Sequence, residues 1–235
     1  MTDQVPAGET HTVGSIRCCS VGVPIPLFNQ AFVFEEPSVD DLQSAVGWLS
    51  QREVPFWVTA PESVANAIGE IAVTPGLVSE GTMPGMALAP LGDVPAGAVG
   101  AADRQLVTDP ALLSDVAVVT AEAFGAPLEA AQMLAPASML DDERCSWFVT
   151  HVDGEPAACG QLLRTDDVAG VYSIAVREQF RRRGLGAAIS WTVLAAGRDA
   201  GCSVGVLQAS PMGEPVYRRM GFETVTPYHL LVPSA

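Results

Sequence analysis

An arginine-rich glycine loop is the feature of this sequence whose residues point most directly to chemistry. The stretch Val171–Ala188 reads VYSIAVREQFRRRGLGAA, and it contains four of the chain's twelve basic residues within seven positions. These are Arg177, Arg181, Arg182 and Arg183. Glycines let backbone N–H groups approach a phosphate, and a helix N-terminus adds a favourable dipole. In a chain of net charge −15, such a loop predicts an anion site, with a pyrophosphate as its natural guest.

A strand–helix–strand unit must position this loop. We expect a strand at Val171–Val176, a helix at Leu185–Ala200 and a strand at Val204–Ala209, and such a crossover makes the two strands parallel. Both strands then end at one sheet edge, where open α/β sheets bind ligands. Ser210 and Pro211 form a suitable N-cap and first position for a following helix. Tyr217 lies about two turns into that helix, so its hydroxyl can point back toward the crevice.

Periodicity and turn residues predict the remaining elements. In the first half, we expect strands at Arg17–Val21, Asn29–Phe34 and Val54–Thr59, a helix at Ser38–Arg52 capped by Ser38, and a helix from Pro61 to about Ile71. In the second half, we expect a strand at Arg104–Val107, helices at Asp109–Phe124 and Glu129–Leu134, and a hairpin of Ser146–Val152 with Ala157–Leu163 through Asp153-Gly154. A short helix at Pro211–Met220 and a strand at Glu223–Val232 complete the chain.

Composition limits the classes of protein that this chain can represent. The segment Ala89–Ala102 has a linker composition, which suggests two regions at 1–100 and 101–235. No purely apolar run reaches 18 residues and the N-terminus has no secretory pattern, so neither a membrane span nor export is expected. Five irregularly spaced cysteines favour reduced thiols in a cytoplasmic protein. The negative charge disfavours nucleic acid and anionic membranes, and no Cys/His cluster has metal-ligand spacing.

Two motifs in the expected order resemble the GNAT acetyltransferase superfamily. Arg181-Arg182-Arg183-Gly184-Leu185-Gly186 is similar to the family's Gln/Arg-x-x-Gly-x-Gly/Ala signature, and Tyr217 to Phe222 is similar to its Tyr-x-x-x-Gly-Phe motif. The loop has neither the GxxxxGK[ST] nor the GxGxxG pattern of nucleotide loops. The resemblance covers roughly residues 104–233. It implies an α/β GNAT fold, a mixed twisted sheet with helices on both faces, preceded by an N-terminal GNAT-like or accessory α/β region.

The resemblance also implies the reaction and its participants. Acetyl-CoA or another acyl-CoA would be the donor, no metal would be needed, and a primary amine would attack the thioester directly. The backbone of Ile174, Ala175 and Val176 would pair with the pantetheine arm, and an N–H near Val176 would polarise the carbonyl oxygen. Tyr217 would protonate the departing thiolate. The pyrophosphate would be held by Arg181, Arg182, Arg183, Gly184, Leu185, Gly186 and Ala187.

Several alternatives stay open at this stage. The domain can instead be a sensor that binds acyl-CoA without turnover, or a scaffold whose loop holds no ligand. The general base is unassigned: Glu122, Asp141, Asp142, Glu143 and a water-relayed base are candidates. Trp48, Phe56 and Trp57 either line an acceptor pocket or pack in the core. The acceptor amine, the length of the acyl group and the oligomeric state, a homodimer included, are undetermined by sequence.

Overall fold

The computed structural model of the chain describes residues 8–98 and 103–234. Their contacts divide into two compact units. Unit 1 contains the described residues up to Gly85 and those from Val225 onward, and unit 2 is Met86–Thr224. This division differs from a boundary at residue 100. Leu91 belongs to unit 2, where it is buried and its N–H donates to the Ser203 carbonyl at 2.7 Å, and residues 99–102 of the expected linker lie outside the described residues.

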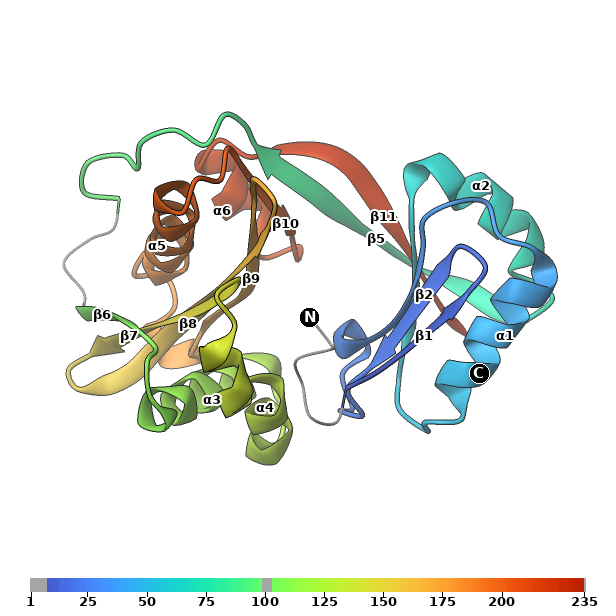
Figure 1. Ribbon diagram of the computed structural model, residues 1–235, viewed down its shortest axis with the longest axis horizontal. Coiled ribbons are helices and arrows are strands. Elements are labelled where there is room, and N and C mark those ends of the chain that lie inside the picture. Colours follow the sequence, from blue (N-terminus) through green and yellow to red (C-terminus); the bar gives the residue numbers. More distant parts are fainter. Residues whose placement is uncertain (1–7, 99–102, 235) are drawn as a thin grey trace. The chain divides into compact units, whose positions relative to one another are not determined.

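Unit 1 is a mixed sheet covered on one face by two helices (Figure 1). Its strand order is β1-β2-β3-β4-β11-β5. The bounds are β1 Glu9–Val13, β2 Ile16–Ser20, β3 Asn29–Val33, α1 Val39–Ser50, β4 Trp57–Pro61, α2 Glu62–Ile71, β5 Leu77–Leu88 and β11 Glu223–Pro233. Strands β3 and β4 are parallel, and β11 runs antiparallel to β4. Both helices contribute to one buried core with the sheet, which explains why their apolar positions recur at helical spacing.

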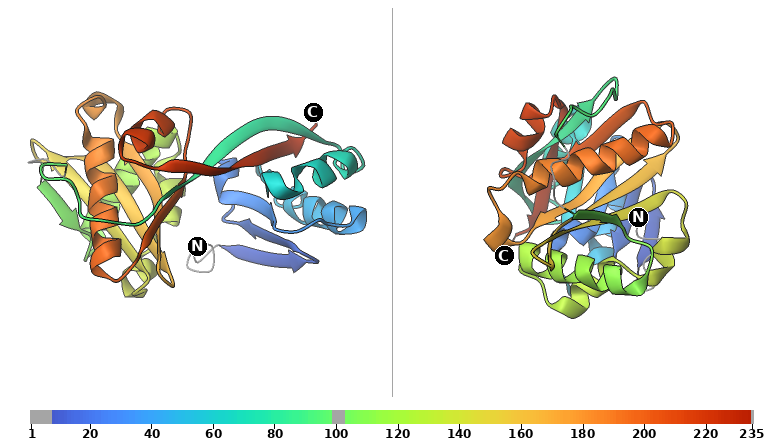
Figure 2. Two further views of the ribbon diagram at one scale, coloured as in Figure 1. Left: turned by 90° about the horizontal axis from the view of Figure 1, so that it is seen from above. Right: turned by 90° about the vertical axis from the view of Figure 1, so that its left-hand side faces the viewer.

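Unit 2 is a sheet with helices on both faces (Figures 1 and 2). Its strand order is β5-β10-β9-β8-β7-β6. The bounds are β6 Asp103–Leu106, α3 Pro110–Phe124, α4 Leu128–Leu134, β7 Cys145–Val152, β8 Glu155–Thr165, β9 Val168–Val176, α5 Leu185–Asp199, β10 Val204–Gln208 and α6 Glu214–Arg219, with 3-10 turns at Ala137–Asp141 and Glu178–Phe180. A further 3-10 turn, Pro26–Phe28, belongs to unit 1. Helices α3 and α4 cover one face and α5 the other.

The predicted elements are largely confirmed, and their local causes are visible. Ser38 caps α1 by accepting the N–H of Asp41, and Asp109 caps α3 by accepting two N–H groups, with Pro110 at the first position. Asp153 and Gly154 both have positive φ, as a two-residue hairpin turn requires. The predicted parallel pairing of β9 with β10 is also present.

Three expectations were wrong in detail. The helix expected at Pro211–Met220 begins only at Glu214, and Ser210 does not cap it. Instead, the Ser210 hydroxyl accepts the Gly213 N–H at 3.2 Å and closes a turn that precedes the helix. The strand expected from Val54 begins at Trp57. Strands β1 and β5 were not anticipated: β1 is polar and exposed, and β5 contains residues that usually interrupt strands.

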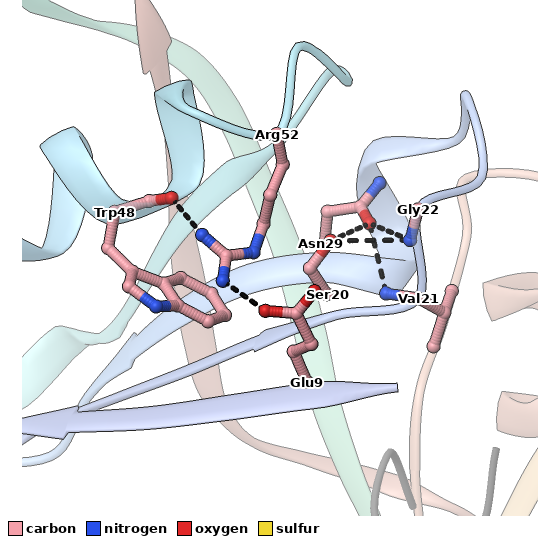
Figure 3. Close-up of polar contacts among 7 residues, drawn as sticks. All are labelled: Glu9, Ser20, Val21, Gly22, Asn29, Trp48 and Arg52. Atoms are coloured by element: carbon pink, nitrogen blue, oxygen red, sulfur yellow. Dashed lines mark hydrogen bonds and ion pairs between the residues drawn. The ribbon is translucent and has the colours of Figure 1, made fainter. Parts of the chain in front are cut away.

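A buried asparagine, Asn29, holds an irregular stretch of backbone in unit 1 through side-chain hydrogen bonds (Figure 3). The Asn29 side chain is fully buried, and its Oδ1 accepts three hydrogen bonds while its Nδ2 donates three, at distances between 2.8 and 3.3 Å. The partners are the Ser20 hydroxyl, the N–H groups of Val21 and Gly22, and the carbonyls of Val23, Ile25 and Pro55. One side chain therefore replaces the hydrogen bonds that this irregular backbone lacks.

Asn29→Ala is expected to destabilise unit 1 by roughly 2–4 kcal/mol, because it strands several buried backbone groups without partners. Urea unfolding followed by circular dichroism measures the change. Asn66→Ala, on the exposed side of α2, is the matched control and should leave the unfolding midpoint unchanged. An equal loss in both variants would contradict the assignment of Asn29 as an anchor.

Trp48 packs against the core of unit 1 and is covered by charged and aromatic groups. The Arg52 guanidinium carbon lies 3.2 Å from the Trp48 ring centroid, and the His11 ring stacks on Trp48 at 5.6 Å. Arg52 also donates to the Trp48 carbonyl and to Glu9 (Figure 3). These contacts assign Trp48 to core packing, one of the two alternatives left open by the sequence.

Candidate functional site

The parallel strands β9 and β10 pair over only part of their length. Their ladder joins Val168–Gly170 to Val204–Val206. Beyond it, β9 continues to Val176 with β8 alone as its hydrogen-bonded neighbour among the described strands. The edge of 174–176 that faces away from β8 therefore has the geometry to pair with an extended ligand. The predicted pantetheine-binding residues Ile174, Ala175 and Val176 lie on this segment.

A β-bulge bends the same segment of β9. Cys159 on β8 pairs with Ala175, but Gln161 pairs with Tyr172, so that Gly160 alone stands opposite two residues of β9. One of these, Ser173, has φ of 51°. A non-glycine residue in this region signals a backbone held by its surroundings, often beside a functional site. The sequence carries no pattern that predicts this bulge.

The loop after β9 has the geometry of an anion site. Gly184 is the N-cap of α5 with φ of 78°, and open space surrounds the place where a Cβ would lie. The first α5 hydrogen bond runs from the Ala188 N–H to the Gly184 carbonyl at 3.0 Å. Within the described residues, the N–H groups of Leu185, Gly186 and Ala187 therefore have no acceptor. Free N–H groups at the start of a 15-residue helix suit a phosphate.

The loop's arginines have different surroundings. Arg181 Nε donates to the Val176 carbonyl at 3.2 Å, and an Arg183 nitrogen donates to the Gln179 carbonyl at 3.2 Å. Arg183 also lies over the Phe180 ring, 5.4 Å from its centroid. Arg182 is exposed and makes no polar contact with the residues that the structure describes. Arg181 and Arg183 thus shape the loop, whereas the side chain of Arg182 is exposed.

Arg177, the fourth basic residue of the stretch, serves a structural role. Its guanidinium pairs with Glu122 at 2.7 Å and Glu155 at 3.5 Å, and it donates to the Pro156 carbonyl at 2.8 Å. The side chain is only 15% exposed. These contacts tie α3 to the end of β9 and direct Arg177 away from an anion.

Two of the four candidate general bases are paired with arginines, and the other two are exposed. Glu122 is held by Arg177. Asp142 accepts hydrogen bonds from the Arg144 side chain and backbone, which hold the pKa of this carboxyl below its usual value. The lowered pKa makes Asp142 a weaker base, and the carboxylate of Glu122 is already engaged by an arginine, so neither residue is favoured. The other two candidates, Asp141 and Glu143, are exposed.

Tyr217 lies beside the first turns of α5. It is 8% exposed, its ring packs edge-on against Phe222 at 5.7 Å, and Ser190 is the polar side chain near its hydroxyl. Ser190 Oγ donates to the Gly186 carbonyl at 2.8 Å. Burial raises the pKa of Tyr217 and outweighs the opposing effect of Ser190. The hydroxyl therefore stays protonated near neutral pH and is suited to donate a proton.

Unit 1 contains its own apolar pocket. Its volume is about 220 Å³, and its lining includes Phe56, Trp57, Glu80 and Val232. The Trp57 indole N–H donates to the Glu80 carboxylate. Phe56 is buried and Trp57 is half-buried, so these two aromatics take part in both packing and pocket lining.

Three general features of the chain concern metal ligands, apolar helices and cysteines. In residues 8–98 and 103–234, no three His, Cys, Asp or Glu side chains gather as a metal site. Over the same ranges no single helix is long and apolar enough to span a membrane. Pro110–Phe124 and Leu128–Asp141 reach that length and apolar character only when taken together, and the pair is bent by 119°. All five cysteines are free thiols, and Cys202 is packed in the core of unit 2.

Solved structures with the same fold are numerous. A GCN5-related N-acetyltransferase from Kribbella flavida is 16% identical, with a TM-score of 0.69 over 99% of this chain and 91% of its own. A GCN5-related N-acetyltransferase from Sphaerobacter thermophilus is 17% identical, with a TM-score of 0.60 over 93% and 80%. A tandem GNAT protein from the clavulanic acid biosynthesis pathway is 15% identical, with a TM-score of 0.62 over 98% and 85%. At these identities the likeness concerns the fold.

The comparison with protein families covers the region that carries both motifs. A search of curated protein sequences gives no match. Residues 113–222 match the model of the Acetyltransferase (GNAT) family, a range that includes α3, the β9 loop and Tyr217. The expected fold class is confirmed, with helices on both faces of the unit 2 sheet and an N-terminal region that also aligns with a tandem GNAT structure. Residues 113–222 of this chain belong to the GNAT acetyltransferase family.

Proposed function

We propose that unit 2 transfers an acetyl group from acetyl-CoA to a primary amine by direct attack of the amine on the thioester. The observation that carries this proposal is the loop Arg181–Ala187, where free N–H groups at the start of α5 follow the segment Ile174–Val176 of β9, which has β8 alone as its hydrogen-bonded neighbour among the described strands. A pyrophosphate on the loop and an extended arm along the strand edge fit one ligand, an acyl-CoA. The negative charge of the chain is compatible with a cationic amine acceptor, and its free thiols with a reducing cytoplasm.

Different residues of the chain bind the donor, polarise its carbonyl group and donate a proton in this proposed reaction. Acetyl-CoA supplies the acetyl group as a thioester. Backbone N–H groups from Arg182 to Ala187 bind the pyrophosphate, and Arg182 adds a positive charge. Backbone groups of Ile174–Val176 hold the pantetheine arm, and an N–H near Val176 polarises the carbonyl oxygen. Tyr217 donates a proton to the CoA sulfur as the bond to the acetyl carbon breaks.

We further propose that unit 1 is a degenerate counterpart of unit 2. The order β3–α1–β4–α2–β5 repeats the order β9–α5–β10–α6–β11, and the first two strands of each series are parallel. The loop between β3 and α1 reads FEEPS, so Glu35 and Glu36 stand in the loop position where unit 2 has arginines, and Asp40 and Asp41 lie in the first turn of α1. Four carboxylates repel a pyrophosphate. The chain then holds one acyl-CoA, in unit 2.

Calorimetric titration of the full chain with acetyl-CoA and with CoA tests this function. We expect micromolar binding of both, with one molecule bound per chain. Release of free CoA thiol in the presence of a panel of primary amines then reports turnover. Binding without turnover across the whole panel would favour the sensor alternative. Absence of binding to either ligand would refute the donor site itself.

A further inference from the structure

A buried cysteine lies directly beneath the bulge in β9. Cys159 on β8 is fully buried, and its Sγ donates to the Ser173 carbonyl at 3.7 Å. Ala175 is the partner of Cys159 in the register of β8 with β9. Cys159 is therefore tied to the backbone on both sides of Ile174, through its thiol to Ser173 and through strand pairing to Ala175, at the point where β8 and β9 lose their regular register.

A second polar side chain holds the thiol in place. Thr120 of α3 is 3% exposed, and its Oγ1 lies 3.6 Å from Cys159 Sγ. Since the thiol donates to the Ser173 carbonyl, the threonine hydroxyl is left to donate to the sulfur. Burial raises the pKa of Cys159 to about 12, so the group remains a protonated donor under physiological conditions. A chain of weak hydrogen bonds thus connects helix α3 to the bulge.

On the opposite face of β8, Gly160 leaves room for the side chain of Ile174, a residue of the bulge. A Cβ on Gly160 would lie 2.7 Å from Ile174 Cδ1 and 3.2 Å from atoms of both Ile189 and Val193 on α5. Ile174 therefore occupies the space that a side chain at Gly160 would fill. Cys159 on one face and Gly160 on the other leave the bulged backbone little freedom to move.

We propose that Cys159 is a positioning residue for acetyl transfer, which fixes the Ser173 bulge and so aims the backbone of Ile174–Val176 at the thioester carbonyl. This inference rests on the proposed function. The Cys159 thiol does not touch substrate and undergoes no covalent step. A misplacement of about 1 Å at a reacting group costs on the order of 100-fold in rate. Loss of a weak contact at this position should therefore lower the rate of acetyl transfer strongly and change the affinity for CoA little.

Cys159→Ala in the full chain tests the proposal, with Cys202→Ala as the matched control. Both substitutions remove a buried thiol from unit 2, but Cys202 follows α5 and belongs to a separate part of the core. Calorimetry measures the affinity for CoA. Infrared spectra of bound acetyl-CoA, labelled with ¹³C at the thioester carbonyl, measure how strongly the backbone polarises that bond, and they require no knowledge of the acceptor.

We expect Cys159→Ala to bind CoA as the unsubstituted chain does, to lose more than half of the carbonyl band shift, and to turn over an accepted amine about 10- to 100-fold more slowly. Cys202→Ala should match the unsubstituted chain in all three. Thr120→Val keeps the volume, removes the hydroxyl and carries the same expectation, so the test survives if Cys159→Ala does not fold. An unchanged band and rate in these variants would overturn the proposal. Failure of the unsubstituted chain to bind acetyl-CoA would instead refute the proposed function.

Discussion

Gly184→Asp is expected to abolish CoA and acetyl-CoA binding while the chain stays folded. The new carboxylate would stand at the N-cap of α5, against the pyrophosphate proposed to bind there. Two such charges about 4 Å apart at a protein surface repel by roughly 4 kcal/mol, which is close to a 1,000-fold loss in affinity. The left-handed φ of 78° costs Asp roughly 1–2 kcal/mol, but a carboxylate at a helix N-terminus recovers part of this loss.

Gly201→Asp is the matched control for this experiment. Gly201 follows the other end of α5, has φ of 93°, and also has no atom within 4 Å of a Cβ position. The control therefore adds the same charge and similar backbone strain in the same unit. Calorimetric titration should show unchanged CoA affinity in Gly201→Asp and none in Gly184→Asp, with similar melting temperatures. Retained affinity in Gly184→Asp would remove the loop from the donor site.

Elements with strong local signals were predictable from sequence. The caps Ser38 and Asp109 define helix starts because their side chains satisfy N–H groups that would otherwise lack partners. The dipeptide Asp153-Gly154 forces a hairpin through its positive φ values. These signals act within a few residues, so no knowledge of distant contacts is required.

Elements that depend on distant partners were not predictable. Strand β5 contains Gly81, Pro84 and Gly85, which locally disfavour a strand. It pairs between β11 and β10 in the strand order, and Gly85 leaves room for the Tyr228 ring of β11, whose Cε2 would stand 2.5 Å from a Cβ there. The late start of α6 has a local cause that the cap-and-proline pattern does not reveal, because Ser210 bonds within a turn and postpones the helix to Glu214.

The candidate site shows the same division between local and distant information. The glycine loop and Tyr217 are recognisable because their residue types and spacing carry the chemistry. The sequence does not show that Arg177 pairs with Glu122, 55 residues away. It also gives no sign of the bulge at Ser173, which arises from strand register and from a buried thiol on the neighbouring strand.

Tyr217→Phe is expected to lower turnover by roughly 10- to 1,000-fold and to leave CoA affinity nearly unchanged. Phenylalanine keeps the edge contact with Phe222 and the packing of the buried ring, and loses only the hydroxyl that meets Ser190. A loss confined to kcat is what removal of a proton donor predicts, because the hydroxyl then acts in the transition state and not in ground-state binding. Steady-state assay of CoA thiol release with an accepted amine, beside calorimetry with CoA, measures both quantities.

The pH dependence of turnover separates a proton donor from a packing residue. A donor must be protonated, and burial raises the pKa of Tyr217 above its ordinary range. Turnover limited by this group should therefore hold steady up to the pH at which a free tyrosine ionises and should fall only above it. Tyr228→Phe, on β11 of unit 1, is the matched control and should retain the rate and the profile. If Tyr217→Phe also retains both, the thiolate leaves without help from this residue, and the proton must come from solvent.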